Sequence, residues 1–195
     1  PSEDAGEPGV RAGEFAKHIT IVDFYHGYPF NIPMPDAIGE QANTYAADQF
    51  ERFLDMMGYQ EVVLRCDNQA ALVRLRSVVK NRRMKQEKIT TEEDTPLYSS
   101  KSNGRTERTI QTTRRHGLTL RSNLEERYGL KVDASMAVWP WLFRHAAWLV
   151  ARFLVRSDTT TAFEALHQLR YMGQIAEFGE CVLFKEAQPD HGRLR

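Results

Sequence analysis

The sequence has little cysteine and no long apolar run. Its two cysteines, Cys66 and Cys181, are too few for a disulfide framework, and their spacing does not form a zinc site. No apolar run approaches the ~18 residues of a membrane span, and no signal peptide precedes the first apolar stretch. These absences exclude disulfide-stabilised secreted domains and predict an intracellular protein that does not insert into a membrane.

The chain also lacks a net charge, because 26 Lys and Arg balance 26 Asp and Glu. The two signs are unevenly distributed along the sequence. Between Arg74 and Arg121, thirteen basic residues accompany five acidic ones. A local excess of this kind attracts phosphate, although a solvated helix surface has the same composition.

Apolar periodicity in the 195 residues, 42% of them hydrophobic, predicts one α/β domain. We expect strands at 18–24, 28–35, 61–67 and 178–185, and helices at 40–57, 69–79, 105–128 and 138–155. Residues 1–14 are expected to be an irregular tail or loop. The polar segment 80–104 has no periodicity and is expected to be a mobile loop with room for a short strand. Sheet strands alternating with helices predict a sheet with helices packed on it.

Three of the expected helices have predicted inward residues, and in the helix at 69–79 these are Leu72, Leu75 and Val79. In the helix at 105–128 these are Ile110, Gly117, Leu118, Leu124 and Tyr128. In the very apolar helix at 138–155, the tryptophans Trp139, Trp141 and Trp148 are expected to belong to the core rather than to a ligand site.

Two carboxylates stand at positions where α/β proteins place chemistry. Asp67 ends the strand at 61–67, and Glu107 lies in the first turn expected for the helix at 105–128. Carboxylates that converge in this way can hold two hard cations about 3.5–4 Å apart for phosphoryl transfer, and Mg²⁺ is the natural ion. Glu107 has a structural alternative, because a first-turn acid is stabilised by the helix dipole and by Arg105 or Arg108.

A polar stripe runs along the same helix. Glu107, Arg114 and Arg121 repeat every seven residues, and Gln111 lies between them, so all four fall on one side. This is where a nucleic-acid backbone would lie if its scissile phosphate were at Glu107.

Several stretches resemble one family. "VVLRCDNQAAL" (62–72) and "SKSNGRTERTIQ" (100–111) are similar to the second and third acids of retroviral and retrotransposon integrases, the D…D…E polynucleotidyl transferases of ribonuclease-H-like fold. "IVDFYHGYPFNIPMPDAIGEQ" resembles the hairpin before the second acid. "VWPWLFRHAAWLVARFLV", "TTTAFEAL" and "EFGECVLF" resemble the tail of integrases in long-terminal-repeat retrotransposon polyproteins. The resemblance covers roughly residues 17 to 185.

The resemblance implies a role for each matching residue. Asp67 and Glu107 would be the catalytic carboxylates and the ligands of Mg²⁺ or Mn²⁺, and Asn103 with Gly104 would form a flexible turn that lets Glu107 move. The implied DNA-binding residues are Asn103, Arg105, Gln111, Arg114 and Arg121. Implied partners are the element ends and target DNA, with a homo-oligomer as the active form and the nucleus as its location.

The resemblance also implies boundaries and a missing part. Residues 15–157 would be the integrase catalytic core, and 158–195 a C-terminal extension. Integrases need a first Asp on a strand that precedes and pairs with the hairpin. Asp23 and Asp4 are candidates, but the favoured expectation is that this Asp and its central strand lie upstream of Pro1, in a longer protein. The expected fold is therefore a ribonuclease-H-like mixed sheet without its first strand.

Three readings remain open. The leading one is an integrase core that cuts and joins DNA strands. The second is a truncated or degenerate core that binds nucleic acid without catalysis. The third is a ribonuclease H, which needs a late aspartate; Asp133 and Asp158 are the only candidates of that type before the last ten residues. The paired His and Cys of the family's zinc module have no counterpart.

Overall fold

The computed structural model describes residues 18–34, 40–94 and 100–182, and within them the side chains of 40–42 and 100–103 are not described. The expected tail at 1–14, with Asp4, lies outside these ranges. The elements in chain order are β1 (His18–Val22), β2 (Pro29–Pro33), α1 (Glu40–Met57), β3 (Glu61–Cys66), α2 (Ala70–Met84), β4 (Ile89–Asp94), α3 (Ser100–Tyr128), α4 (Trp139–Phe153) and α5 (Ala162–His167). The predicted α/β class is confirmed.

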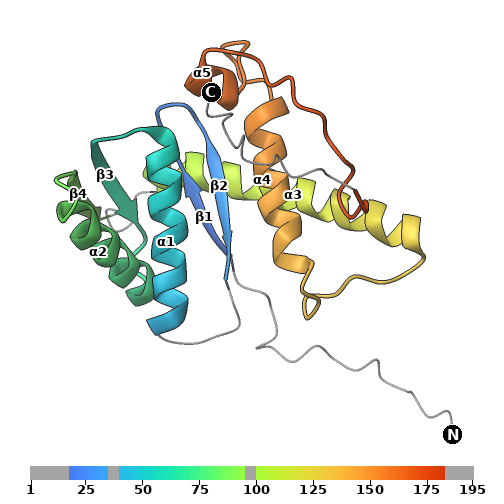
Figure 1. Cartoon of the computed structure of the whole chain (residues 1–195), viewed down its shortest axis with the longest axis horizontal. Coiled ribbons are helices and arrows are strands. Elements are labelled where there is room, and N and C mark those ends of the chain that lie inside the picture. Colours follow the sequence, from blue (N-terminus) through green and yellow to red (C-terminus); the bar gives the residue numbers. More distant parts are fainter. Residues whose placement is uncertain (1–17, 35–39, 95–99, 183–195) are drawn as a thin grey trace, which may run out of the picture.

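The described strands form two separate pairs instead of the expected single mixed sheet. β1 and β2 are antiparallel, with His18 opposite Pro33 and Val22 opposite Pro29. β3 and β4 are parallel, with Glu61 opposite Ile89. No ladder joins the two pairs within the described residues. Figure 1 shows the pairs apart, with α1 lying across the space between them.

One apolar core nevertheless joins the two pairs through α1. Phe53 and Leu54 of α1 belong to the same buried cluster as Tyr28 beside β2, Leu64 of β3 and Ala151 of α4. α1 supplies this contact because its apolar residues recur at helical spacing, and it ends at Gly58, whose φ of +74° lies in the left-handed region. Ala162 of α5 is part of this cluster too, so the segment expected to be an extension packs on the core.

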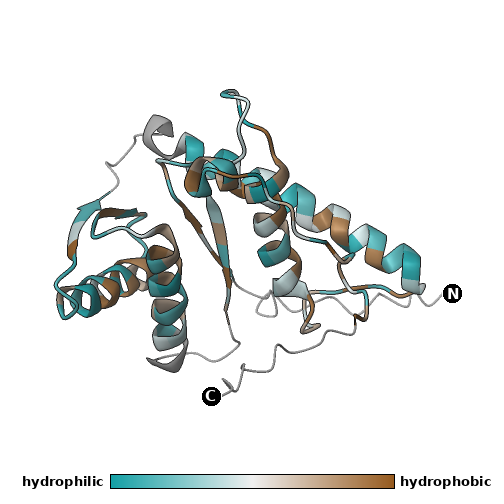
Figure 2. Cartoon of the chain, turned by 45° about the horizontal axis from the view of Figure 1, so that its top comes forward, coloured by the Kyte–Doolittle hydropathy of each residue, from teal (hydrophilic) through white to brown (hydrophobic). Residues whose placement is uncertain are grey.

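A second core lies between α3 and α4. It contains Leu124, Val132, Leu142 and Phe143. The two helices cross closely at Gly117, where an added Cβ would lie 2.7 Å from the ring of Phe143. Figure 2 shows α3 and α4 beside the β1–β2 hairpin, with apolar residues on both helices.

The segment 80–104 contains regular structure where a mobile loop was expected. α2 continues to Met84, and 89–94 form strand β4 on the edge of β3. α3 begins at Ser100, so Asn103 and Gly104 have helical backbone and do not form a turn. The turn prediction was wrong because it relied on the local preference of Asn-Gly, which the helical context overrides.

Two further expectations about packing were wrong. On α3 the buried residues are Thr113, Gly117 and Leu124, whereas Ile110, Leu118 and Tyr128 are exposed, because the small residues let α4 come close. Trp141 is 49% exposed and is not a core residue, although Trp139 packs against Phe143. The last strand expected, at 178–185, is absent from its described part, 178–182.

Candidate nucleic-acid interface and acidic pair

The basic excess seen in the sequence divides into two parts in the structure. In the first part, around α2 and β4, four basic side chains are paired with acids. The pairs are Arg76 with Asp94 (2.7 Å), Lys80 with Glu92 (2.9 Å), Arg82 with Asp48 (2.5 Å) and Lys88 with Asp55 (2.7 Å). These ion pairs neutralise much of the positive charge of α2, so this surface is a weak candidate for binding phosphate.

Arg83 belongs to the same helix but is buried. Its side chain is 1% exposed and donates hydrogen bonds to the carbonyl oxygens of Tyr59 and Gln60 and to the hydroxyl of Thr90. Burial lowers the pKa of this guanidinium. Arg83 therefore joins α2 to the N-terminal end of the β3–β4 pair and does not present its charge to a ligand.

In the second part, on α3, basic side chains are exposed and largely unneutralised. Arg108, Arg114 and Arg115 are exposed, and no described carboxylate lies within ion-pair distance of them. Arg105 is also exposed, and its Nη1 donates to the carbonyl oxygen of Phe24 (2.5 Å). The exposed face of α3 therefore presents several neighbouring positive charges that are available for a ligand.

The predicted stripe along α3 has one member with a different environment. Glu107, Gln111 and Arg114 are exposed. Burial lowers the pKa of the His18 imidazole, and the positive charge of Arg114 lowers it further. Arg121 instead donates to Glu125 (2.8 Å) and lies over the ring of Trp139. Arg121 is thus held against the protein, whereas the three others face solvent.

The two predicted catalytic acids are exposed on separate elements. Asp67 follows β3 directly, as predicted. Glu107 lies two turns into α3 because the helix begins at Ser100, so its expected place in the first turn was wrong. Among the described residues, no group of three or more His, Cys, Asp or Glu is placed to hold a metal ion. The described chain offers two carboxylates of the kind that Mg²⁺ binds, but not a complete donor set.

Asp23, one candidate for the first catalytic acid, has a structural environment. Its carboxylate accepts hydrogen bonds from the backbone N–H groups of Tyr25 (3.2 Å) and His26 (2.7 Å) and from the hydroxyl of Tyr59 (3.1 Å). The His26 imidazole is 3.0 Å away. These contacts close the β1–β2 turn and fix it to the segment between α1 and β3. Burial, followed by the charge of Asp23, raises the pKa of Tyr59.

The two late aspartates also make local contacts. Asp133 accepts hydrogen bonds from the backbone N–H and the hydroxyl of Ser135. Asp158 pairs with Arg156 and accepts from the backbone N–H of Thr160. Each carboxylate therefore stabilises the turn in which it stands.

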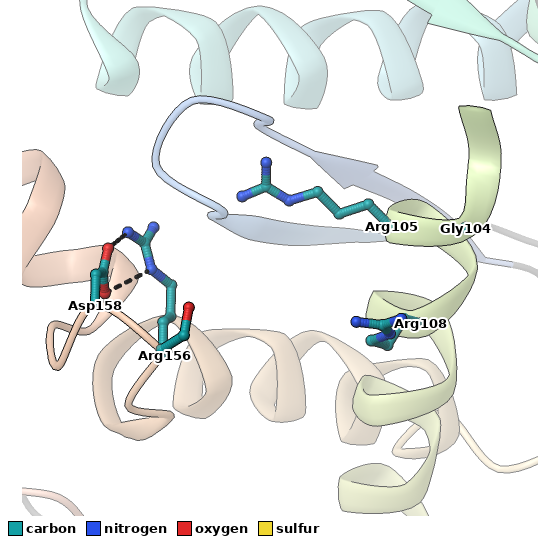
Figure 3. Close-up of a pocket in the computed structure, with 6 residues that line it drawn as sticks. Gly104, Arg105, Arg108, Arg156 and Asp158 are labelled. Atoms are coloured by element: carbon teal, nitrogen blue, oxygen red, sulfur yellow. Dashed lines mark hydrogen bonds and ion pairs between the residues drawn. The ribbon is translucent and has the colours of Figure 1, made fainter. Parts of the chain in front are cut away.

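One feature was not predicted from the sequence. An open pocket of about 670 Å³ lies between α3, the β1–β2 turn and the segment after α4. Figure 3 shows Arg105 extending from α3 toward the Arg156–Asp158 pair, with Arg108 beside it. The pocket's lining residues are Gly104, Arg105, Arg108, Arg156, Ser157 and Asp158. Sequence spacing gives no sign of it, because the fold alone brings 156–158 next to α3.

No model of a known protein family matches this chain, and no curated protein sequence gives a significant match. Within the described residues, no helix is both long and apolar enough to cross a membrane. Three features of the chain itself therefore indicate what it can bind. They are an exposed basic face of α3, an arginine-lined pocket beside it and two solvent-facing carboxylates.

Proposed function

We propose that this chain is the catalytic core of an integrase of the long-terminal-repeat retrotransposon type, which binds DNA along α3 and cuts and joins DNA strands. The observation that carries the proposal is the division of the basic residues. Arg76, Lys80 and Arg82 of α2 pair with Asp or Glu, whereas Arg108, Arg114 and Arg115 of α3 face solvent without an acidic partner in the described chain. An exposed basic stripe on one helix suits contact with successive phosphates.

The arrangement of the strands supports the ribonuclease-H-like reading. The elements follow the order strand, strand, helix, strand, helix, strand, helix, with an antiparallel hairpin before a parallel pair. The resemblance implies one more strand, which carries the first Asp and pairs with the hairpin. Placed between β1 and β3, that strand would join the two pairs into one mixed sheet.

The proposal includes two Mg²⁺ or Mn²⁺ ions. Asp67 and Glu107 would be their ligands in this chain, together with the Asp of the additional strand. When bound, the ions would activate the attacking oxygen and stabilise the leaving one. The part of this chain is to supply two carboxylates and to hold the DNA strand by α3. A homo-oligomer in the nucleus, acting on element ends and target DNA, completes the proposal.

A second candidate function is nucleic-acid binding without catalysis. It is favoured by one observation, that Asp67 and Glu107 stand on separate elements with no third acid grouped with them in the described residues. Both candidates need DNA binding by α3, and they differ only in whether DNA strands are joined.

Fluorescence anisotropy with a labelled duplex tests the function shared by both candidates. We expect the affinity to fall steeply as salt rises, and Arg114→Ala to make the slope of log affinity against log salt shallower by about one unit. Arg52→Ala is the matched control, since Arg52 is an exposed residue of α1 and its loss removes the same charge. Equal slopes for both variants, or no binding by the unaltered chain, would contradict the proposal.

A further inference from the structure

Two guanidinium groups from distant parts of the chain meet over the β1–β2 turn. A Cβ built on Gly27 would lie 3.1 Å from Nη2 of Arg105 and 3.2 Å from Nη1 of Arg156. Gly27 has a φ of +71°, and its lack of a side chain leaves the space that the two groups occupy. Arg105 comes from α3 and Arg156 from the segment after α4, so the hairpin turn is the platform on which they converge.

The hydrogen bonds at this platform fix the arginines without neutralising them. Arg105 donates to the carbonyl oxygen of Phe24, and Arg156 donates to that of His26. Neutral carbonyl groups orient a guanidinium but leave its charge in place. The one carboxylate of the pocket, Asp158, is paired with Arg156 and also accepts from the N–H and hydroxyl of Thr160.

Arg108 adds a third positive charge to the same pocket. It is exposed, lines the pocket, and has no carboxylate of the described chain within ion-pair distance. Three arginines therefore surround a space that contains a single acid. Like charges held together in this way repel one another, and an anion placed between them removes the repulsion.

We propose that the pocket lined by Arg105, Arg108 and Arg156 is a binding site for one phosphodiester group of a DNA strand. This assignment rests on the proposed function and adds to it a site off the stripe of Glu107, Gln111 and Arg114. Arg105 and Arg108 supply the contacts to the phosphate oxygens. Arg156, already bonded to His26 and Asp158, forms the far wall of the pocket.

The chemistry of the pocket favours a phosphate group. Guanidinium groups donate pairs of parallel hydrogen bonds that match the geometry of phosphate oxygens. Arg105 uses one nitrogen for Phe24 and keeps other N–H groups for a ligand. The pocket is open, so that a polymer can pass through it, and Arg115 lies seven residues from Arg108 on the same side of α3. A strand bound in the pocket would therefore continue along the helix.

Duplex affinity measured by anisotropy at low salt tests the site. Arg108→Gln is the informative variant, because Arg108 has no structural partner in the described chain and its loss should leave the melting temperature unchanged. We expect Arg108→Gln to weaken DNA binding about tenfold, because it removes a hydrogen bond between charged groups. Arg108→Lys keeps the charge and should weaken binding less. Arg52→Gln is the matched control and should leave the affinity unchanged. Pyrophosphate, a small phosphate ligand, is titrated separately by NMR of the arginine side chains.

The outcomes separate this site from the function on which it rests. If Arg114→Ala weakens binding and Arg108→Gln behaves like Arg52→Gln, the pocket is not a DNA contact, although the proposed function stands. If the chain binds pyrophosphate in a manner that depends on Arg108 but binds no duplex, the assignment to DNA is overturned together with the proposed function. A selective loss in Arg108→Gln, with pyrophosphate competing against the duplex, supports the site.

Discussion

The two halves of this molecule are stabilised by different forces. The region of the hairpin, α3 and α4 is held by apolar packing, and most of β2 is buried. The rings of Phe143 and His18 stack with their centroids 4.8 Å apart, and Gly117 lies against the Phe143 ring. In the region of β3, β4 and α2, many charged contacts add to the apolar packing of Leu64, Leu75 and Val79 against α1. Three side chains of α2 donate hydrogen bonds to β4: Arg76 to Asp94, Lys80 to Glu92 and Arg83 to Thr90.

The difference shows what the second region lacks. Parallel strands are normally covered on both faces, yet Val63 is 60% exposed and Ile89 is 59% exposed. Charged contacts can fix the position of such strands, but they supply less stability than apolar burial and weaken with salt. The parallel pair should therefore be the less stable region, and one that gains from another strand beside β3.

The largest effect is expected in the apolar region. Phe143→Ala removes the ring that contacts His18, Trp139 and Gly117, and should cost about 3–5 kcal/mol of unfolding free energy. Urea unfolding measures the cost, and hydrogen exchange shows where it is felt, with the hairpin and α4 losing most protection. Phe143→Leu keeps much of the apolar volume and should cost less. Equal losses of protection in β3 and β4 would mean that the two regions are not distinct.

A smaller effect is expected for the charged region. Arg76 is buried, with its side chain bonded to Asp94 and to the carbonyl oxygen of Glu93 (2.8 Å). Arg76→Ala should cost about 1–3 kcal/mol, and high salt should shrink the difference between this variant and the unaltered protein. Arg76→Lys, which keeps the charge but not the forked contacts, is the control. A loss that does not change with salt would show that Arg76 acts through packing of its aliphatic part.

Acid should affect the two regions in different pH ranges, and this is the smallest effect. Burial, and then the charge of Arg114, lower the pKa of His18 from its ordinary 6.5. The stabilisation from neutral His18 is therefore complete above that value and is lost as the pH falls through the lower folded pKa. Hydrogen bonds from Lys80 and then Ser77 lower the pKa of Glu92 from 4.5, so its stabilisation is complete above 4.5 and lost in more acidic solution.

Hydrogen exchange followed from neutral pH down to about pH 3 can resolve the two transitions, since each loss begins below the ordinary pKa of its group and these ordinary values differ between His and Glu. The hairpin should lose protection before the β3–β4 pair does. His18→Gln should remove the first transition alone, and Glu92→Gln the second alone. Simultaneous loss in both regions would show that one cooperative unit, and not local titration, controls the response to acid.

Much of the fold was predictable where one strong local signal was present. α1 was predicted at its observed bounds because its apolar periodicity is continuous and Gly58 ends it. The β1–β2 hairpin was predicted because two β-rich runs flank His26-Gly27. In contrast, β4 was anticipated only as a short strand without bounds within 80–104, because the pairing of its charged string "ITTEED" with β3 depends on contacts with α2 that no local preference reports.

The site was predictable only in part. The position of Asp67 directly after β3 was predicted because a carboxylate ends a short apolar run, and the exposure of Glu107, Gln111 and Arg114 on one side of α3 agrees with their spacing. The start of α3 was missed, because polar residues and Asn-Gly favour a turn when they are considered locally. The arginine pocket was missed because Arg156 reaches α3 only through the packing of α4 against the hairpin.

Strand joining measured on the chain extended upstream by its own sequence tests the central claim most directly. With Mg²⁺ and a duplex that carries an element end, the extended chain should join DNA strands, and residues 1–195 alone should not. Asp67→Asn and Glu107→Gln should each abolish joining, while Asp23→Asn should affect stability more than joining. Joining that survives the loss of Asp67 or Glu107 would contradict the account, as would joining by residues 1–195 alone that Asp23→Asn abolishes.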